Sequence, residues 1–468
     1  MSDSLIAVEV NDALLAVADE SGVLYTEPGY VVVEDGSVRF GLDALPLIRR
    51  HPQAASSRYW RDFSAEPLAR PLPGPLGGFR SNAEIVAAQL RRLWSRHGAG
   101  RTGVVYATPA WWTDEQVRAL VALSESLGMQ VLGLADAAVA ACRHEQPGRE
   151  LLQLDASLHT LMLSRIRQVG HAGLGTLPGD REGFPMLGIE PLLRLCMETL
   201  ARRFVECSRF DPLHDSLAEQ ALFDRLPDWL ARLARDAEVQ LELTTRSGTF
   251  GATIEGTEFR LRVARACEPL LQKLRARVAE RGPHALQVHP RLADIPGVLE
   301  ALLRLPDTAV HVLAPGAAAA GLAGRAAAVL GRGPGPVVIT ELPWDEGPAD
   351  PPAAVSTPPS GPETLPTHLL VGHRAYRLGP GSFRIGAELK PGEAGVALDP
   401  GLRGLSRQHC TLRRENGALL VVDHSRFGTW LNGHRIEGAA LVQAGDVLSL
   451  GAPPVELRLL AEADGDGA

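Results

Sequence analysis

A proline-rich segment divides this chain of 468 residues and limits how its parts can fold. Residues 341–364 contain seven prolines, interspersed with Gly, Ala, Ser and Thr. Proline rarely continues a helix or an inner strand, because its ring fixes the backbone and removes the N–H donor. We therefore predict an extended linker at residues 341–365. It separates a domain at residues 1–340 from a second domain at residues 366–460, and an acidic tail at residues 461–468 follows.

Two polar loops in the second domain carry residues suited to binding a phosphate group. Ser406 and Arg407 are neighbours, so a hydroxyl and a guanidinium can meet one anion from the same loop. Arg426 opens a second loop, and its planar guanidinium can bind two phosphate oxygens at once. Gly428 and Gly433 permit tight turns in which a side chain would clash. The pattern indicates an anion-binding site on loops between short strands, in which apolar and polar residues alternate.

The order of these residues is similar to that in forkhead-associated (FHA) domains. The runs Ser406-Arg407-Gln408-His409 and Gly428-Thr429-Trp430-Leu431-Asn432-Gly433 resemble that family's Ser-Arg-x-His and Gly-Thr-x-x-Asn-Gly signatures. The resemblance implies an all-β sandwich whose loops bind phosphothreonine peptides. It assigns peptide binding to Ser406, Arg407, Arg426, Thr429 and Asn432. It assigns structural roles to Gly386, His409, Gly428 and Gly433.

Two positions depart from the family pattern. Ala387 stands where the family commonly has a phosphate-binding arginine, directly after Gly386. Phe427 stands where the family often has an asparagine that contacts the ligand backbone. Arg426 is a candidate to replace the missing charge. The alternative is that the domain binds an unphosphorylated partner and serves as a scaffold.

The first domain is expected to be an α/β fold. Apolar runs at residues 5–18 and 151–166 each predict a β-hairpin, and strands alternate with helices between them. Such alternation indicates βαβ units. Residues 218–235 have helical spacing, but we expect Pro227 to split them into two shorter helices. Residues 239–263 are expected to form strands.

Three runs in this domain resemble the nucleotide-binding domain of the seventy-kilodalton heat-shock chaperones. They are Thr108-Pro109-Ala110, residues 127–132 and residues 135–141. The resemblance implies an actin-like ATPase fold, which is ribonuclease-H-like, across residues 1–340. It also places a nucleotide site, here expected to be vestigial, near Glu9, Asp136, Asp155 and Thr160.

The two phosphate-binding hairpins of that family lack their glycines in this chain. Glycines matter there because they let backbone N–H groups crowd the anion. The hairpins read Glu9-Val10-Asn11-Asp12 and Asp155-Ala156-Ser157-Leu158-His159-Thr160. We therefore expect a degenerate pseudo-ATPase without catalytic residues, without a metal site and without bound ATP or Mg²⁺. The alternative is an active chaperone-like ATPase that is regulated through its FHA domain.

Charge, hydrophobicity and cysteine usage limit the kinds of partner and the cellular location that we expect. The net charge of −8 argues against a nucleic-acid partner. The apolar run at residues 309–324 is broken by Pro315 and glycines, so no membrane span is expected. The five cysteines are scattered and no secretory signal is visible, which favours the cytoplasm. We expect a signalling adaptor that binds a phosphothreonine-containing protein, with a Ser/Thr protein kinase in its pathway.

Overall fold

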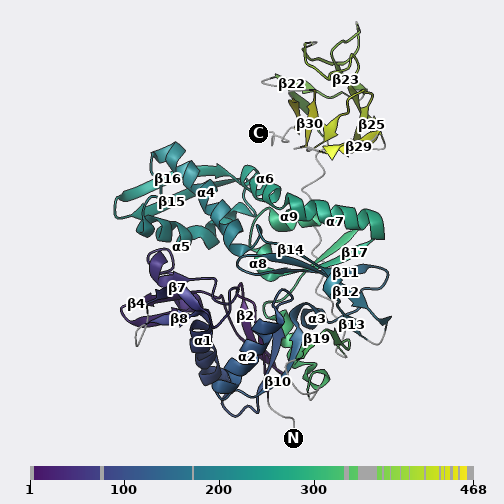
Figure 1. The fold of residues 1–468 in the computed structure, drawn as a ribbon. Helices are drawn as coiled ribbons and strands as arrows, with labels where there is room; N and C mark the ends of the chain where they lie inside the picture. Colours follow the sequence, from purple (N-terminus) through teal and green to yellow (C-terminus); the bar gives the residue numbers. More distant parts are fainter. Residues whose placement is uncertain are drawn as a thin grey trace, which may run out of the picture. The chain divides into compact units, whose positions relative to one another are not determined.

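The computed structural model describes most of the chain. The described residues are 5–73, 78–170, 173–330, 337–345, 366–371, 374–379, 381–390, 392–399, 401–415, 418–431, 434–436, 438–442, 446–451 and 454–460. By its internal contacts the chain divides into two compact units, one within Met1–Ser356 and one within Thr357–Ala468. Figure 1 shows the helices and strands of each unit.

A six-stranded sheet with the order β19-β10-β9-β1-β2-β3 belongs to the first unit. β1, β2 and β3 are antiparallel to one another in sequence order, whereas β9, β10 and β19 continue from β1 in parallel. Its strands are β1 (Ile6–Glu9), β2 (Leu15–Asp19), β3 (Gly22–Glu27), β9 (Val104–Thr108), β10 (Val131–Asp136) and β19 (Val338–Ile339). β1 and β9 are buried along their whole length, as their apolar sequences predict.

A second sheet repeats this arrangement later in the chain. Its strands β14, β12, β11, β17 and β18 follow the same order as β3, β2, β1, β9 and β10 in the first sheet. The pairings of β11 with β12 and β12 with β14 are antiparallel, and those of β11 with β17 and β17 with β18 are parallel. The strands are β11 (Glu150–Ala156), β12 (Leu161–Gln168), β14 (Arg181–Phe184), β17 (His284–Val288) and β18 (Thr308–Val312). Both predicted hairpins, β1–β2 and β11–β12, are therefore present.

The residues after β19 connect the two sheets. β19 pairs with β10 of the first sheet, and β20 (Glu341–Leu342) pairs with β13 (Leu174–Gly175) of the second. Farther on, the Arg143 Nε donates to the Asp345 carboxylate at 2.6 Å. Residues 341–345, which we expected to begin the linker, are thus part of this unit, because their apolar residues complete backbone ladders before the prolines dominate. The rest of the expected linker lies outside the described residues.

Two short alanine-rich helices, α3 (Ala137–Ala141) and α10 (Ala317–Ala323), pack against each other. They share one hydrophobic core with strands of both sheets. Their backbones approach so closely that a Cβ atom on Gly321 would lie 2.0 Å from the Ala140 carbonyl oxygen. Only small side chains therefore allow α3 and α10 to pack this closely.

A mainly helical insertion follows β14 (Figure 1). It contains α4 (Ile189–Ser208), α5 (Ser216–Leu233), β15 (Glu238–Thr245), β16 (Gly248–Glu255), α6 (Gly256–Ala266) and α7 (Glu268–Arg281). Two predictions are wrong here. Pro227 lies inside one continuous helix, because the apolar face of α5 is buried in the core on both sides of it. The strands end at Glu255, since Phe259 and Val263 are spaced to bury one face of α6.

The remaining elements complete the first unit. They are β4 (Val31–Glu34), β5 (Ser37–Phe40), β6 (Ala55–Ser56), β7 (Pro67–Leu72), β8 (Phe79–Ser81), α1 (Asn82–His97), α2 (Asp114–Ser126), α8 (Pro290–Ala293) and α9 (Val298–Leu303). Among the residues that the structure describes, no helix is both long and apolar enough to cross a membrane.

The second unit consists of two sheets that enclose a common core. One has the order β22-β21-β31-β30-β27-β28, with β22 (Arg374–Arg377), β21 (His368–Val371), β31 (Val455–Leu460), β30 (Val447–Leu450), β27 (Trp430–Leu431) and β28 (His434–Arg435). The other has the order β24-β23-β25-β26-β29, with β24 (Gly395–Ala397), β23 (Phe383–Gly386), β25 (Cys410–Glu415), β26 (Ala418–Asp423) and β29 (Ala439–Val442). The alternation of buried and exposed residues along these strands is typical of a β-sandwich.

Candidate functional site

Two loops at strand ends of the second unit are joined by His409. The first loop precedes β25 and contains Ser406 and Arg407, and the second follows β26 and runs to Gly428. The imidazole of His409 is fully buried, and its Nδ1 accepts a hydrogen bond from the Ser406 N–H at 3.1 Å. Its Nε2 lies 3.1 Å from the Gly428 carbonyl oxygen, which can only accept, so Nε2 carries the proton. Burial lowers the pKa of His409, which keeps the ring in this neutral form.

The second loop is held by a network around Asp423. The Asp423 carboxylate accepts hydrogen bonds from the Ser425 N–H at 3.0 Å and from the Thr429 hydroxyl at 2.8 Å. The Ser425 hydroxyl oxygen in turn accepts from the Gly428 N–H at 2.7 Å. Although burial acts in the opposite direction, these hydrogen bonds lower the pKa of Asp423, so the carboxylate stays charged. The loop is therefore fixed before any ligand arrives.

Thr429 does not lie where we expected. We predicted that it contacts a bound peptide, but its side chain is fully buried and donates its proton to Asp423. Its role is to hold the loop. The motif alone could not show this, because sequence spacing says nothing about which side of the loop a hydroxyl faces.

Ser406 and the arginines form the exposed part of the site. The Ser406 hydroxyl oxygen accepts a hydrogen bond from the Arg426 backbone N–H at 3.3 Å, which links the two loops directly. Its proton is left to donate outward. The Arg407 side chain is 84% exposed and has a loose contact with Glu388, at 3.8 Å between Nε and the carboxylate. Arg426 is exposed as well. A hydroxyl and two exposed arginines thus lie on two loops that this hydrogen bond joins.

Glycine is required at two positions that we assigned to structure. A Cβ atom on Gly386 would lie 2.1 Å from the Arg407 carbonyl oxygen, so β23 can approach the first loop only without a side chain. Gly428 has φ +95°, a conformation that favours glycine, and a Cβ there would lie 2.4 Å from the Arg435 Nε. Asn432, which we expected to contact the peptide, and Gly433, which we assigned to structure, lie outside the described residues.

The position after Gly386 supplies no charge. Ala387 donates its N–H to the Ser406 carbonyl oxygen at 3.1 Å, so it supports the first loop with its backbone only. Arg384 does not replace the missing arginine, because its guanidinium is bound to Glu393 at 2.6 Å. Phe427 is 62% exposed in the second loop and offers an apolar surface beside the arginines.

Arg435 is a cation near the site that the sequence did not reveal. It is exposed, it pairs with Trp430 across β27 and β28, and its Nε lies close to Gly428. The signal was the strand register, which brings residue 435 opposite residue 430 once the turn at residues 432–433 is assumed.

The two hairpins of the first unit meet through side chains where the sequence suggested a nucleotide site. The Asn11 side-chain amide donates to the Asp155 carboxylate at 3.0 Å. The Asp12 carboxylate accepts from the Leu158 N–H at 2.6 Å. The Glu9 carboxylate accepts from the N–H groups of Ala318 and Ala319, at 3.1 and 3.2 Å, near the start of α10. Protein groups therefore take up the donors that a phosphate would use.

Little space is left between these groups. A cavity lined by Glu9, Asp155 and His289 has a volume of ≈ 10 Å³, about enough for one water molecule. Burial and the nearby Asp155 raise the pKa of Glu9 to about 8, although the hydrogen bonds from Ala318 and Ala319 act in the opposite direction. Burial likewise raises the pKa of Asp12 to about 7 and that of Asp155 to about 6. The described residues contain no cluster of three or more His, Cys, Asp or Glu side chains suited to a metal ion.

The other two residues of the expected nucleotide site also have protein partners. Asp136 forms an ion pair with Arg181 and accepts from the Thr176 hydroxyl at 3.2 Å. Burial raises its pKa, while Arg181 acts in the opposite direction. Thr160 lies in the turn between β11 and β12, where its N–H donates to the Ser157 hydroxyl oxygen at 2.9 Å.

Comparison with known proteins identifies the second unit. The family model of the FHA domain matches residues 383–451, which include both loops around His409. The chain therefore contains an FHA domain, a module that binds phosphothreonine-containing proteins. No curated protein matches the chain.

Proposed function

We propose that this protein is a signalling adaptor whose FHA domain binds a phosphothreonine-containing partner protein in a Ser/Thr protein kinase pathway. The observation that carries the proposal is the convergence of two rigid loops on one exposed site. Ser406 and the Arg426 backbone lie within hydrogen-bond distance, and the Arg407 side chain is 84% exposed next to them. Preorganised loops lose little conformational entropy when a ligand binds, which favours affinity. The exposed arginines favour a ligand that is negatively charged.

Each exposed residue has a distinct role in this proposal. The Ser406 hydroxyl donates its free proton to a phosphate oxygen. Arg407 and Arg426 supply the charge-assisted hydrogen bonds that a dianion needs. Arg435 adds positive charge from the neighbouring strand. Together these groups compensate for Ala387, which leaves the usual arginine position uncharged.

Phosphatase treatment separates this proposal from a scaffold that ignores phosphate. The full chain is immobilised and exposed to a phosphothreonine peptide library, half of which is first dephosphorylated. We expect the treated half to lose binding. Equal retention of both halves would favour the unphosphorylated-partner alternative.

We further propose that the first unit is a degenerate actin-like domain and a scaffold rather than an ATPase. The repeated strand order of its two sheets supports the fold. The hydrogen bonds between the hairpins, together with the cavity of ≈ 10 Å³, support the loss of nucleotide binding between the hairpins. Incubation of the full chain with Mg²⁺ and ATP is expected to give no hydrolysis. Saturable binding with hydrolysis would support the active, chaperone-like alternative.

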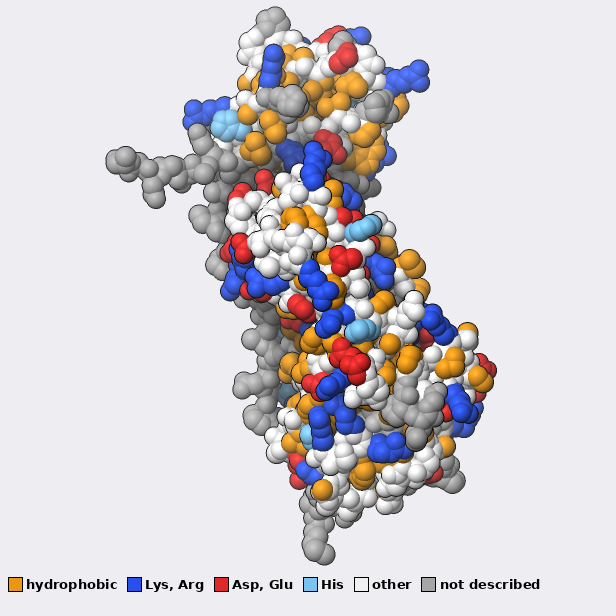
Figure 2. All heavy atoms as spheres, turned by 90° about the vertical axis from the view of Figure 1, so that its left-hand side faces the viewer, with side chains coloured by type: hydrophobic (Ala, Val, Ile, Leu, Met, Phe, Trp, Pro, Cys, Tyr) orange, Lys and Arg blue, Asp and Glu red, His pale blue; other side chains and the backbone are white. Residues whose placement is uncertain are grey.

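The proposed partner is a protein and not a nucleic acid. The chain has 47 Lys and Arg against 55 Asp and Glu, and the face drawn in Figure 2 shows both signs interspersed. A nucleic-acid surface would instead need a continuous basic patch. The five free cysteines also support our assignment to a reducing, cytoplasmic compartment.

A further inference from the structure

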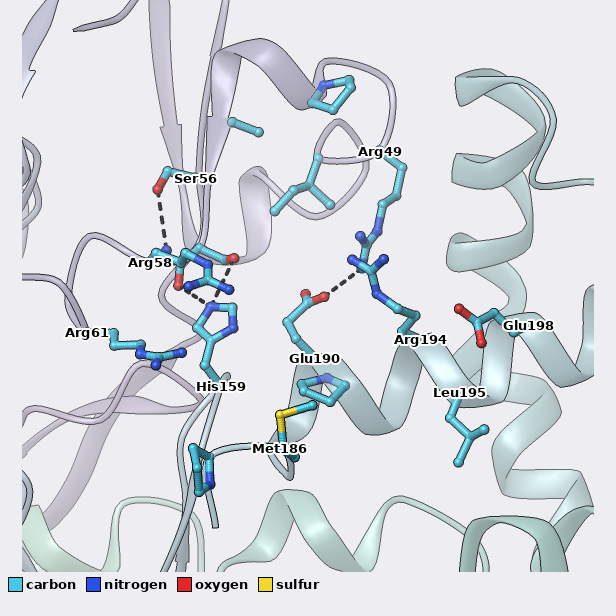
Figure 3. Close-up of a pocket in the computed structure, with 16 residues that line it drawn as sticks. Arg49, Ser56, Arg58, Arg61, His159, Met186, Glu190, Arg194, Leu195 and Glu198 are labelled. Carbon is cyan, nitrogen blue, oxygen red and sulfur yellow. Dashed lines mark hydrogen bonds and ion pairs between the residues drawn. The ribbon is translucent and has the colours of Figure 1, made fainter. Parts of the chain in front are cut away.

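A second anion-binding pocket is suggested by the first unit, remote in sequence from the FHA domain (Figure 3). Its volume is ≈ 550 Å³, which is in the range of small-molecule sites. One wall comes from residues 48–61 and the other from residues 185–198 at the start of α4. His159, in the turn between β11 and β12, lies between the walls.

Arginines dominate the charge of this pocket. Four line it, Arg49, Arg58, Arg61 and Arg194, against the two acids Glu190 and Glu198. In Figure 3, Arg58 and Arg61 lie beside His159, whereas Arg49 and Arg194 approach each other next to Glu190. The positive groups therefore form two clusters, one beside His159 and one next to Glu190, where Arg49 of the first wall meets Arg194 of the second.

Much of this charge has no ion-pair partner among the described residues. Arg49 pairs with Glu190 at 2.9 Å, and Glu190 also accepts from the Tyr30 hydroxyl, so this acid is fully engaged. In the part of the chain that the structure describes, Arg58 and Arg194 form no ion pair. Arg61 makes a long contact of 3.7 Å with the half-exposed Asp62, and its charge also acts on the buried Asp12, whose pKa it lowers. Unpaired guanidinium groups thus remain on both walls.

His159 adds an acceptor that becomes a donor if it is protonated. Its Nε2 lies 3.0 Å from the Ser57 carbonyl oxygen, so in the neutral ring Nε2 carries the proton. Burial lowers the pKa of His159, and the nearby Arg58 and Arg61 lower it further, while Glu190 acts in the opposite direction. An anion among these arginines would reverse that effect.

We propose that this pocket binds a small molecule that carries two or more phosphate groups, one held at each of the two arginine clusters. Planar guanidinium groups bind phosphate oxygens in pairs, which suits this chemistry. A single phosphate would reach only one of the two clusters, and a longer anion can bridge them. Because the walls come from segments on either side of the β11–β12 turn, such a ligand would also tie these segments together.

Calorimetric titration of the full chain with inorganic tripolyphosphate at constant ionic strength tests the proposal. We expect one saturable site that binds tripolyphosphate more tightly than inorganic phosphate or citrate. The double variant Arg58→Gln/Arg194→Gln should lose about tenfold or more in affinity, since charge-assisted hydrogen bonds are removed from both walls.

Two controls define what would overturn it. The double variant Arg91→Gln/Arg202→Gln removes the same charge from exposed helix positions outside the pocket and should bind normally. Arg407→Gln, in the FHA loops, should also bind normally. No saturable binding, an equal loss in the control double variant, or equal affinity for inorganic phosphate would each refute the pocket. Preference for citrate would show a carboxylate site instead.

Discussion

Single side chains hold the FHA site together and expose its charge. His409 joins the two loops through both ring nitrogens, and Asp423 fixes the second loop. The motifs pointed to Ser406 and Arg407, and the structure leaves both accessible to a ligand. The motifs could not show that Thr429, unlike these two residues, is buried, because its burial depends on how the loop folds back on Asp423. They also could not reveal Arg435, whose position depends on strand register.

Replacing Ser406 by alanine separates binding from stability. Ser406 is partly exposed, and its hydroxyl accepts a long hydrogen bond of 3.3 Å from the Arg426 N–H, so Ser406→Ala should leave the melting temperature nearly unchanged. Loss of a hydrogen bond to a charged ligand should weaken phosphothreonine peptide binding by about ten- to a hundredfold. Fluorescence anisotropy measures the affinity, and Ser425→Ala, which removes a hydroxyl inside the loop, should instead lower stability. Normal affinity in Ser406→Ala would remove this residue from the site.

Glu9 should make the stability of the first unit depend on pH. Burial raises its pKa from 4.5 to about 8, so the folded state holds the proton more tightly than the unfolded chain. Stability is then greatest below the ordinary pKa and is lost as the pH rises from about 4.5 to about 8. Glu9→Gln keeps an acceptor for Ala318 and Ala319 but cannot ionise. Thermal unfolding across this range should show a flatter profile and higher stability at pH 8 for Glu9→Gln.

The raised pKa values of Asp12 and Asp155 should leave a smaller slope in that variant. Glu115→Gln, which changes an exposed acid on α2, serves as the control and should follow the wild-type profile. An unaltered slope in Glu9→Gln would mean that Glu9 is already ionised at neutral pH.

At the scale of helices and strands, the spacing of apolar residues predicted hairpins correctly where no proline interrupted the pattern. Both hairpins predicted from the apolar runs at residues 5–18 and 151–166 are present. α5 does not agree with the prediction, because its buried residues outweigh the lost hydrogen bond at Pro227. β19 and β20 were also missed, since two-residue strands have no detectable period and become strands only through their partners.

Removing the proline from α5 should stabilise the first unit. Pro227 is exposed within the helix, and proline in a helix interior costs about 3 kcal/mol relative to alanine. Pro227→Ala is therefore expected to raise the free energy of unfolding by about 1–3 kcal/mol, seen by calorimetry as a higher melting temperature. Pro227→Gly restores the N–H but adds backbone freedom, so its gain should be smaller by about 1 kcal/mol. A lower melting temperature in Pro227→Ala would show that the proline suits a local bend.

The whole molecule contains two units, and the proline-rich segment between them predicted this division. Composition predicted the division but placed the linker too early, because residues 341–345 complete the sheets and contacts of the first unit. The sequence predicted two hairpins and βαβ units, but it did not show that the two sheets repeat one topology. The closure of the hairpins over Asp155 depends on contacts between residues more than a hundred positions apart, which no local pattern contains.

The central claim is that the FHA domain still binds peptides in a phosphate-dependent way, although Ala387 stands where the family commonly has an arginine. Calorimetric titration of the full chain with a phosphothreonine peptide and with its unphosphorylated counterpart tests it most directly. We predict saturable binding of the phosphorylated peptide alone, weakened by raised salt and by Arg407→Gln, because guanidinium groups supply the attraction. Equal binding of both peptides, or binding of neither across a diverse set, would contradict the claim.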